Sequence, residues 1–228
     1  MEKVEVLRQY FGFSSFREGQ QTLIDAVLAG RDVLGVMPTG GGKSLCYELP
    51  ALLLPGLTLV ISPLISLMKD QVMALQNAGI PAGCIHSAMS VEELREAYRD
   101  TRFGAYKILY IAPERLLTDG FCALAQELEI SLLAVDEAHC ISQWGQDFRP
   151  SYLKILDFLQ KLPRRPALAA FTATATAQVR SDIVRILQLQ DPVTVVTGFD
   201  RPNLRFEVLR PQDKRRALLE LLEERRDK

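Results

Sequence analysis

Two adjacent carboxylates, Asp136 and Glu137, follow a short apolar run at 132–135. Such a run is typical of a strand buried on both faces of a parallel sheet, where ligands bind at the carboxyl ends of the strands. An aspartate there can hold Mg²⁺ through its water shell, and a neighbouring glutamate can orient and deprotonate an attacking water. The same pair could instead cap a following helix. Because the pair alone fits both interpretations, the choice depends on a second motif.

A glycine-rich loop with the sequence M-P-T-G-G-G-K-S occupies residues 37–44. It follows an apolar run at 33–36 and precedes an expected helix at 45–54, which is the order that a phosphate-binding loop requires. Glycines let backbone N–H groups approach a β-phosphate, Lys43 would neutralise the β- and γ-phosphates, and the Ser44 hydroxyl would ligate Mg²⁺. The alternative is a glycine-rich turn without a ligand; with the carboxylate pair downstream, we expect ATP and Mg²⁺ here. The expected nucleotide-binding residues of the loop are Thr39, Gly40, Gly41, Gly42, Lys43 and Ser44.

A third segment, at 143–149, combines two aromatic rings with a cation. Gln143 and Trp144 are followed within a few residues by Phe148 and Arg149, and Trp144 is the single tryptophan of the chain. Stacking faces next to a positive charge suit sequence-tolerant contact with single-stranded nucleic acid. The alternative is a buried aromatic pair that holds the loop in place.

Seven blocks in the same order make the chain resemble the superfamily 2 helicases, and among them the RecQ family of DNA helicases. The general phosphate-loop pattern has glycine where this chain has Met37, but helicases of this kind relax that position and keep the core at 39–44. The resemblance implies an ATP- and Mg²⁺-dependent helicase that moves 3′ to 5′ on DNA in recombination and repair. The blocks are residues 13–20, 37–47, 62–71, 110–116, 136–150, 171–175 and 199–203.

The first block resembles the family's adenine-reading segment. An aromatic ring at Phe13 can stack on a purine, Arg17 can lie near the base or the phosphates, and Gln20 can pair its amide with the adenine edge. Phe13 and Phe16 could also be plain core residues, which is the interpretation we favour for Phe16.

Other residues acquire a role mainly from their motif position. His139 is expected to link the carboxylate pair to Thr172, and the resemblance gives Thr172 and Thr174 a part in coupling hydrolysis to DNA, although such residues often only form turns. Lys69 and Arg115 are candidates for DNA contact, although composition alone would make each an ordinary surface charge.

In the RecQ family the segment that corresponds to residues 143–149, here called the aromatic loop, senses single-stranded DNA and relays this to the ATP site. This chain has Gln146 where the family usually carries histidine. Glutamine keeps hydrogen bonding and loses a protonation switch, so we expect a differently tuned relay.

The composition is that of an ordinary globular protein, with 48% hydrophobic and 24% charged residues in a chain of 228. A net charge of −1 does not indicate a nucleic-acid-binding protein, so a local basic groove would have to bind DNA. No leader and no long apolar run is visible, which predicts a cytoplasmic protein without a membrane segment. The cysteines are far apart and predict buried free thiols, and two histidines are too few for a metal cluster. These residues are Cys46, Cys84, Cys122, Cys140, His86 and His139.

Apolar and amphipathic segments alternate along the chain, which predicts a three-layer α/β fold, a RecA-like P-loop lobe with a mainly parallel sheet. Strands are expected at 33–36, 57–61, 82–86, 108–111, 132–135, 167–171 and 193–196, and helices at 64–77, 91–102, 152–161 and 176–187.

Near residue 197 the alternation of apolar and amphipathic segments gives way to a stretch rich in turn-forming residues. We expect residues 1–197 to form the first RecA-like domain, and residues 198–228 to form a linker and the truncated start of a second one, with a strand at 204–209 and an amphipathic stretch at 213–228. The rest of that second lobe would be missing, and with it an arginine that stabilises the transition state. We therefore expect this fragment to bind ATP, to hydrolyse it poorly and to unwind nothing.

Two other functions stay open at this point. An RNA-remodelling ATPase would share the phosphate loop and the carboxylates, although the aromatic loop argues against it. A non-catalytic nucleic-acid-binding module would have lost its nucleotide chemistry, although the joint presence of Lys43, Ser44, Asp136 and Glu137 argues against decay.

Overall fold

The computed structural model describes residues 2–145, 147–198, 208 and 210–224. The strands in these ranges are β1 Val33–Val36, β2 Leu57–Ile61, β3 Ala82–Ile85, β4 Ile108–Ile111, β5 Ile130–Val135, β6 Ala167–Thr172 and β7 Val193–Val196. The α-helices are α1 Lys3–Phe11, α2 Gln20–Leu28, α3 Leu45–Leu53, α4 Ile65–Asn77, α5 Val91–Arg102, α6 Asp119–Glu127, α7 Lys154–Leu159, α8 Ala177–Ile186 and α9 Lys214–Glu224. The short 3₁₀ helices are η1 Pro113–Arg115, η2 Ala138–Ile141 and η3 Pro150–Leu153.

The seven strands form one sheet in the order β3-β4-β2-β5-β6-β1-β7, and every described pairing is parallel. Strands β1, β2, β4 and β5 are almost wholly buried, which explains why they are continuous apolar runs in the sequence. The outer strand β7 alternates between half-buried and exposed residues. All carboxyl ends therefore meet at one edge of the sheet, where the motif residues follow.

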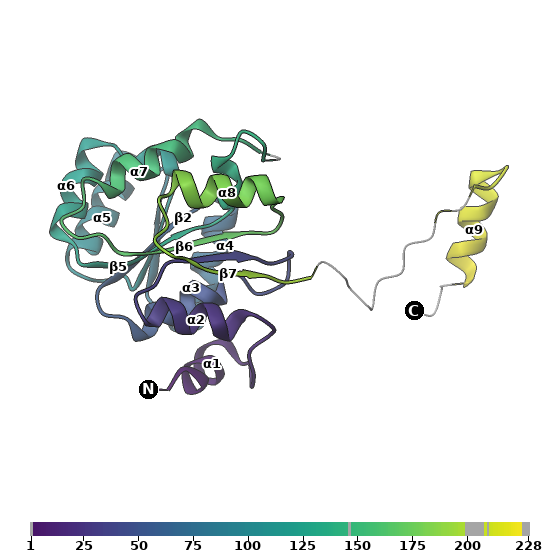
Figure 1. Ribbon diagram of the computed structural model, residues 1–228, viewed down its shortest axis with the longest axis horizontal. Coiled ribbons are helices and arrows are strands. Elements are labelled where there is room, and N and C mark those ends of the chain that lie inside the picture. Colours follow the sequence, from purple (N-terminus) through teal and green to yellow (C-terminus); the bar gives the residue numbers. More distant parts are fainter. Residues whose placement is uncertain (1, 146, 199–207, 209, 225–228) are drawn as a thin grey trace. The chain divides into compact units, whose positions relative to one another are not determined.

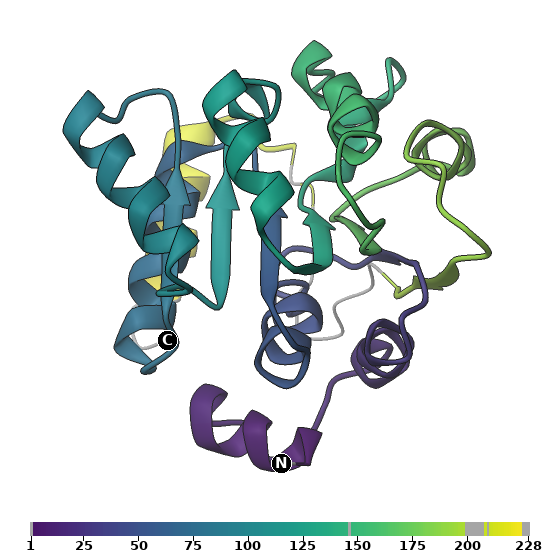
Figure 2. The same cartoon turned by 90° about the vertical axis from the view of Figure 1, so that its left-hand side faces the viewer.

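Helices cover both faces of the sheet, so the expected three-layer α/β fold is confirmed (Figures 1 and 2). Helices α1 to α4 pack on one face, with Leu7, Ile24, Leu49 and Met68 among the buried contacts. Helices α5 to α8 pack on the other face. Figure 1 shows α7 and α8 above the sheet and α1 and α2 below it.

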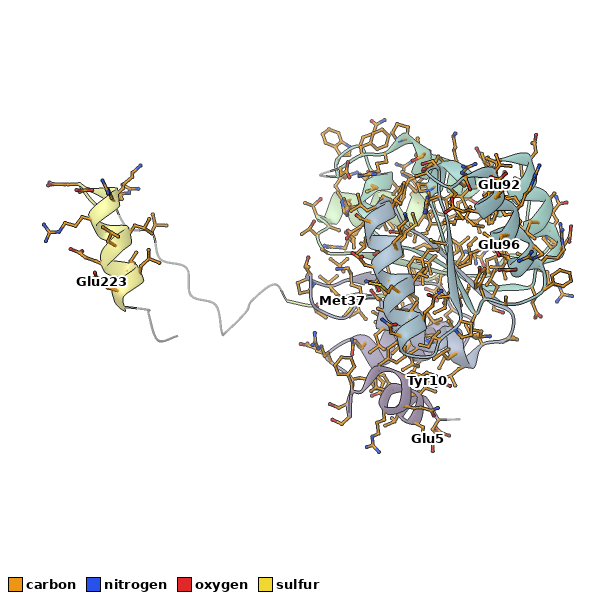
Figure 3. The ribbon with its side chains drawn as sticks, turned by 180° about the vertical axis from the view of Figure 1, so that it is seen from behind. Glu5, Tyr10, Met37, Glu92, Glu96 and Glu223 are labelled. Atoms are coloured by element: carbon orange, nitrogen blue, oxygen red, sulfur yellow. The ribbon has the colours of Figure 1, made fainter. Side chains whose placement is uncertain are left out.

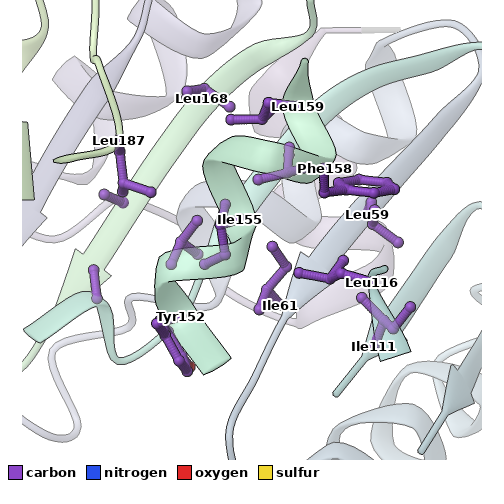
Figure 4. Packing of buried hydrophobic residues seen from close by; sticks show 14 of the residues in the cluster. Leu59, Ile61, Ile111, Leu116, Tyr152, Ile155, Phe158, Leu159, Leu168 and Leu187 are labelled. Carbon is purple, nitrogen blue, oxygen red and sulfur yellow. The ribbon is translucent and has the colours of Figure 1, made fainter. Parts of the chain in front are cut away.

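The core under α7 illustrates how the second face is filled. Ile155 and Phe158 of α7 pack toward Leu59 and Ile61 of β2, with Leu116 beside them (Figure 4). Phe158 also stacks on Phe121 of α6, with ring centroids 5.6 Å apart. Burial of large apolar side chains on both faces is the dominant stabilising contribution in a fold of this kind.

Local sequence fixes where α5 begins. Ser90 and Glu93 form a capping box, in which the Ser90 hydroxyl accepts from the Glu93 N–H at 3.2 Å and the Glu93 carboxylate accepts from the Ser90 N–H at 2.7 Å. Glu92 and Glu96 project from the outer side of α5 (Figure 3) and are exposed. The helix begins at Val91 and ends at Arg102, as its sequence predicts.

The expected elements correspond closely to the observed ones, with two differences among the helices. The helix expected at 152–161 is split into η3 and α7, and helices α1, α2 and α6 were not predicted. Cys84 and Cys122 are only half-buried, whereas Cys46 and Cys140 are buried as expected. The strand expected at 204–209 lies outside the described residues except for residue 208.

The chain separates into two compact units, residues 1–198 and residues 199–228. The described part of the second unit contains α9, whose Leu218, Leu219 and Leu222 are exposed. No helix in the described residues is both long and apolar enough to span a bilayer.

Candidate functional site

A cavity of about 440 Å³ opens at the carboxyl ends of β1 and β5. It joins the phosphate loop, the carboxylate pair and the segment before α2, so motifs more than a hundred residues apart meet in one site. The lining residues are Phe13, Ser15, Arg17, Gln20, Thr39, Gly40, Gly42, Lys43, Ser44, Leu45, Leu67, Gln71, Asp136 and Glu137.

The phosphate loop has the backbone that its glycines predict. Gly40 and Gly42 both have a φ of +79°, in the left-handed region that other residues rarely adopt. A Cβ on Gly41 would lie 2.8 Å from the Pro38 carbonyl oxygen, so the close turn there requires glycine. The Lys43 ammonium donates to the Met37 carbonyl at 3.2 Å, which holds its charge over the loop.

Gln20 and Arg17 bind the phosphate loop directly. The Gln20 amide is 2% exposed; its Nε2 donates to the Gly42 carbonyl at 3.0 Å, and its Oε1 accepts from the Arg17 N–H at 2.7 Å. The Arg17 guanidinium also donates to the Gly40 carbonyl. The Nε2 end of the Gln20 amide therefore supports the loop, while its Oε1 end is held by the Arg17 backbone. Phe13 lines the cavity and is 51% exposed, so it is not a core residue, whereas Phe16 packs partly against the core as expected.

Asp136 lies at the end of β5, where its N–H donates to the Ile61 carbonyl at 2.9 Å. Burial and the adjacent Glu137 raise the pKa of Asp136 to about 6, while the Glu137 N–H and Lys43 act against this rise. Glu137 itself has a φ of +47°, which is uncommon outside glycine. Strained backbone of this kind is often found at functional sites, and here it turns the Glu137 side chain toward the cavity and His139.

His139 connects the carboxylate pair to the end of β6. Its Nδ1 lies 2.8 Å from the Thr172 hydroxyl and 3.3 Å from the Glu137 carboxylate. Cys140 and Glu137 beside the ring raise the pKa of His139 to about 9, and the contact with His139 lowers the pKa of Glu137. The contact that the sequence predicts between His139 and Thr172 is therefore present, and Glu137 is ionised at neutral pH.

Strand order explains why Thr172 occupies this position. Strand β6 lies between β5 and β1, so its last residue separates the carboxylate pair from the phosphate loop. The Thr172 carbonyl accepts from the Met37 N–H at 3.0 Å, while its hydroxyl faces His139. The Thr174 N–H donates to the same hydroxyl at 3.3 Å. One buried threonine thus contacts both halves of the site.

The aromatic loop leaves its tryptophan in solvent. Trp144 is 76% exposed, which excludes a buried aromatic pair, and Phe148 is half-buried. A second cavity of about 320 Å³ lies between this loop, with Gln143, Trp144 and Phe148, and helix α8. The loop is fastened to α8 through Ser142, whose hydroxyl donates to Asp182 at 2.7 Å and accepts from the Trp144 N–H at 3.2 Å.

Arg149 and Tyr152 connect the aromatic loop to the rest of the site. The Arg149 guanidinium donates to the Pro63 carbonyl at 3.0 Å, beside the end of β2, and also pairs with Asp147. The buried Tyr152 hydroxyl donates to the Asp136 carbonyl at 2.9 Å. The Tyr152 N–H also donates to the Arg149 carbonyl at 2.9 Å, so Tyr152 joins the aromatic loop to the carboxylate pair.

The two remaining candidates, Lys69 and Arg115, do not line the nucleotide cavity. Lys69 is exposed on α4, and Arg115 is half-buried in η1. Gln146 lies outside the described residues.

Some lining residues were not assigned a function from the sequence. Leu67 and Gln71 of α4 reach the nucleotide cavity, as does Ser15. Gln71 and Ser15 are polar members of the RecQ-like blocks at 62–71 and 13–20, which is the signal that could have pointed to them. Tyr152 carries no such signal, because a tyrosine two residues after a loop is usually a packing residue.

The sequence profile described as DEAD/DEAH box helicase matches residues 17–183. The chain belongs to this helicase family. Membership implies that the cavity binds a nucleoside triphosphate, in agreement with the loop geometry.

Similar curated sequences place the chain in the RecQ branch of helicases, as its motifs predict. It is 49% identical to the ATP-dependent DNA helicase RecQ of Bacillus subtilis over 97% of this chain and 38% of that protein. It is 48% identical to RecQ of Pasteurella multocida over 90% of this chain and 32% of that protein. The chain therefore spans about a third of the length of these relatives.

Solved structures of helicases share the fold. A hypothetical ATP-dependent RNA helicase from Sulfolobus tokodaii aligns with a TM-score of 0.66 at 21% identity, over 85% of this chain and 56% of that one. The helicase MrfA bound to DNA aligns with the same TM-score at 16% identity, over 86% of this chain and 29% of that one. At these identities the likeness supports a RecA-like helicase fold.

Proposed function

We propose that the cavity binds ATP with Mg²⁺ and that the chain is the ATP-binding lobe of a RecQ-type helicase, which couples ATP hydrolysis to 3′-to-5′ DNA unwinding in recombination and repair. The observation that carries this proposal is the meeting of Lys43 and Ser44 with Asp136 and Glu137 in one cavity. A glycine-rich turn without a ligand would not require a carboxylate pair at its open side.

Each residue then has a defined chemical task. Lys43 and the loop N–H groups would bind the β- and γ-phosphates, and the ionised Glu137 would orient an attacking water and accept its proton. Bound Mg²⁺ would neutralise phosphate charge. The described residues contain no cluster of three or more His, Cys, Asp or Glu side chains suited to a metal, so Ser44 and Asp136 would share the ion with phosphate oxygens and water.

Recognition of the base is proposed for the segment before α2. Phe13 has an exposed ring in the cavity, available for stacking on adenine. Gln20 and Arg17 hold loop carbonyls through their side chains, so an adenine contact from Gln20 would exchange an existing hydrogen bond for a new one. We therefore propose that binding of the base changes the hydrogen bonds that these two residues make to the phosphate loop.

DNA contact is proposed for the aromatic loop and the adjacent basic residues. Gln143, Trp144, Phe148 and Arg149 would meet single-stranded DNA, with Lys69 and Arg115 on its backbone. His139, Thr172 and Thr174 would then couple this contact to hydrolysis.

We also propose a division of the chain at the change in sequence character. Residues 1–197 would form the first RecA-like domain, and residues 198–228 would be a linker and the start of a second one, as the length of the relatives supports. A cytoplasmic location is proposed, because the bacterial relatives are named DNA helicases and bacterial DNA lies in the cytoplasm.

The proposal is tested by direct binding of a fluorescent ATP analogue and of single-stranded DNA to the 228-residue chain. Lys43→Ala should weaken Mg²⁺-dependent analogue binding by about tenfold or more, because a charge-assisted phosphate contact is lost. The exposed Lys161→Ala is the matched control and should bind as the unaltered chain does.

DNA should quench the fluorescence of Trp144, the single tryptophan. Equal analogue binding by the Lys43 variant would reject the nucleotide site. Quenching by RNA of the same sequence at much lower concentration than by DNA would favour an RNA-remodelling ATPase instead.

A further inference from the structure

A buried series of polar side chains lies behind the phosphate loop. Tyr47 and Tyr110 are each 1% exposed and do not line the nucleotide cavity, whereas Ser44 does. The Tyr47 hydroxyl is hydrogen-bonded to the side chains of Ser44 and Tyr110. The Tyr110 hydroxyl in turn donates to the buried Glu48 carboxylate at 3.0 Å. Four polar side chains are thus joined in series, and the first of them, Ser44, reaches the cavity.

Helix α3 and strand β4 hold this series in place. Ser44 directly precedes α3 and Tyr47 lies three residues later, so both side chains lie on the same side of the helix. The Tyr47 ring packs on Phe171 of β6, with ring centroids 5.6 Å apart. Tyr110 comes from β4, which is buried along its whole length. Because the surrounding core is closely packed, the Tyr47 hydroxyl has a fixed position behind Ser44.

The chemistry of the groups gives the series a direction. A hydroxyl has one proton to donate, and a carboxyl group offers an acceptor oxygen whether or not it is ionised. The Tyr110 proton goes to Glu48, so the Tyr110 oxygen is left to accept the Tyr47 proton. The Tyr47 oxygen is then left to accept the proton of Ser44. Burial raises the pKa of both tyrosines, so both keep their protons at neutral pH.

We propose that Tyr47 is a positioning residue for the metal site: it accepts the proton of the Ser44 hydroxyl and thereby turns the lone pairs of Ser44 toward Mg²⁺ in the nucleotide cavity. This inference rests on the proposed binding of ATP with Mg²⁺. A hydroxyl ligates a cation through a lone pair, and a proton that faces the cation opposes binding. Ser44 is available for this task, because its side chain does not cap α3. Asp136, the other proposed ligand, acts on Tyr47 through its charge and therefore lies near it as well.

Binding of the fluorescent ATP analogue to the 228-residue chain, with saturating MgCl₂ and with EDTA, tests the proposal. The ratio of the two affinities, here called the magnesium enhancement, measures what the metal ligands contribute. Tyr47→Phe keeps the ring and removes the acceptor of the Ser44 proton. Because groups that orient a metal ligand typically contribute tenfold or more to metal affinity, this variant should lower the magnesium enhancement by about tenfold. Its affinity for the analogue in EDTA should change by less than about twofold.

Two results with Tyr47→Phe would overturn the proposal. An unchanged magnesium enhancement would show that another acceptor, such as Asp136, takes the Ser44 proton. A loss of affinity of equal size with MgCl₂ and with EDTA would show that Tyr47 only supports the packing of α3. If the unaltered chain binds the analogue equally well with and without Mg²⁺, the proposed binding of Mg²⁺ itself fails, and the unaltered chain alone reveals this result.

A double-mutant cycle with Ser44→Ala tests whether Tyr47 acts through Ser44. Ser44→Ala removes the ligand itself and should lower the magnesium enhancement at least as much as Tyr47→Phe does. In the Ser44→Ala background, Tyr47→Phe should change the enhancement by less than about twofold, because no Ser44 proton is left to accept. Equal effects of Tyr47→Phe in the two backgrounds would contradict the inference.

Tyr110→Phe tests the direction of the series from one link further away. Without the Tyr110 oxygen, the Tyr47 proton can turn to Ser44, and the Ser44 proton then faces the cavity. The magnesium enhancement should fall by about threefold or more, although Ser44 and Tyr47 are unaltered. Urea denaturation shows whether each variant is folded, and Tyr110→Phe carries the test if Tyr47→Phe is not.

Tyr106→Phe is the matched control for the loss of a tyrosine hydroxyl. The half-buried Tyr106 hydroxyl donates to the Asp100 carboxylate at 3.4 Å, and neither residue lines the nucleotide cavity. Its magnesium enhancement should equal that of the unaltered chain. A fall as large as that of Tyr110→Phe would assign the effect to a general loss of stability and would overturn the proposed direction of the series.

Discussion

Glu48 is a buried carboxylate on α3, four residues after Ser44, and the Tyr110 hydroxyl donates to it at 3.0 Å. Burial raises the pKa of Glu48 to about 7, against the opposing effect of the Tyr110 hydrogen bond. Because the folded-state pKa is raised, the protein loses stability as the pH rises from about 4.5 to about 7 and Glu48 is forced to ionise. Glutamine keeps the acceptor and carries no charge. Glu48→Gln should therefore stabilise the chain by about 3 kcal/mol at about pH 8 and by almost nothing at about pH 4.

Urea denaturation at the two pH values measures this difference. An equal gain in stability at both pH values would show that packing, and not ionisation of Glu48, accounts for the difference between the variant and the unaltered chain. Tyr110→Phe is the informative partner, because it removes the donor to the Glu48 carboxylate and should destabilise the chain by about 1–3 kcal/mol.

A second prediction at the residue scale follows from the contact between Glu137 and His139. The pKa of His139 is raised to about 9 by Cys140 and Glu137, so the imidazolium contributes stability that is present below its ordinary pKa and lost as the pH rises through about 9. Glu137→Gln removes one of the two causes and should move the His139 pKa back toward its ordinary value. Histidine NMR measures the shift, and Asp147→Asn, an exposed carboxylate in the aromatic loop, is the control. An unmoved His139 pKa in the Glu137 variant would show that the Glu137 carboxylate does not act on the His139 ring.

At the scale of elements, the conformation of the phosphate loop depends on its glycines. Gly42 has a φ of +79°, and a Cβ there would collide with the Gln20 amide. Gly79 has nearly the same φ, +78°, but a Cβ there would meet nothing within 4 Å. Both alanine variants should lose about 1–2 kcal/mol of stability from backbone strain. Only Gly42→Ala should also weaken binding of the ATP analogue, by about tenfold or more, since Gln20 must move. Equal analogue affinities of the two variants would show that Gln20 does not position the loop.

The sequence predicts elements well where burial imposes a pattern. Strands β1, β2, β4 and β7 were predicted with their observed bounds, because a parallel strand covered by helices is a short apolar run between turns. Helices α1, α2 and α6 were missed; each is nine residues long, about two and a half turns, so its apolar positions recur too few times to give a clear helical pattern. Which face each helix covers is a tertiary property that single-sequence patterns do not contain.

The sequence predicted most of the residues that line the cavity and one contact, between His139 and Thr172, but not the other contacts within the site. The meeting of Lys43 with Asp136 follows from a rule of parallel sheets, namely that carboxyl ends share one edge. The position of Thr172 between them requires the strand order, and the use of the Gln20 amide by the phosphate loop requires coordinates.

At the scale of the whole molecule, the buried core belongs to one unit. All members of the two core clusters lie between Val6 and Val195, within the unit of residues 1–198. The nucleotide cavity and the aromatic loop lie in the same unit. A domain of this size normally folds independently. The described part of the unit of residues 199–228 contributes α9, whose Leu218, Leu219 and Leu222 are exposed.

Removal of residues 199–228 should therefore leave the remaining unit intact. The thermal unfolding midpoint should change by less than about 2 °C, since a loss of 1 kcal/mol shifts a domain of this size by about 2–4 °C. Affinity for the fluorescent ATP analogue should be unchanged, because the lining residues of the cavity are all retained. Differential scanning fluorimetry and analogue titration on the shortened and the 228-residue chains measure both quantities. A fall of several degrees, or a loss of nucleotide binding, would show that the unit of residues 1–198 depends on residues 199–228 for its stability or its nucleotide affinity.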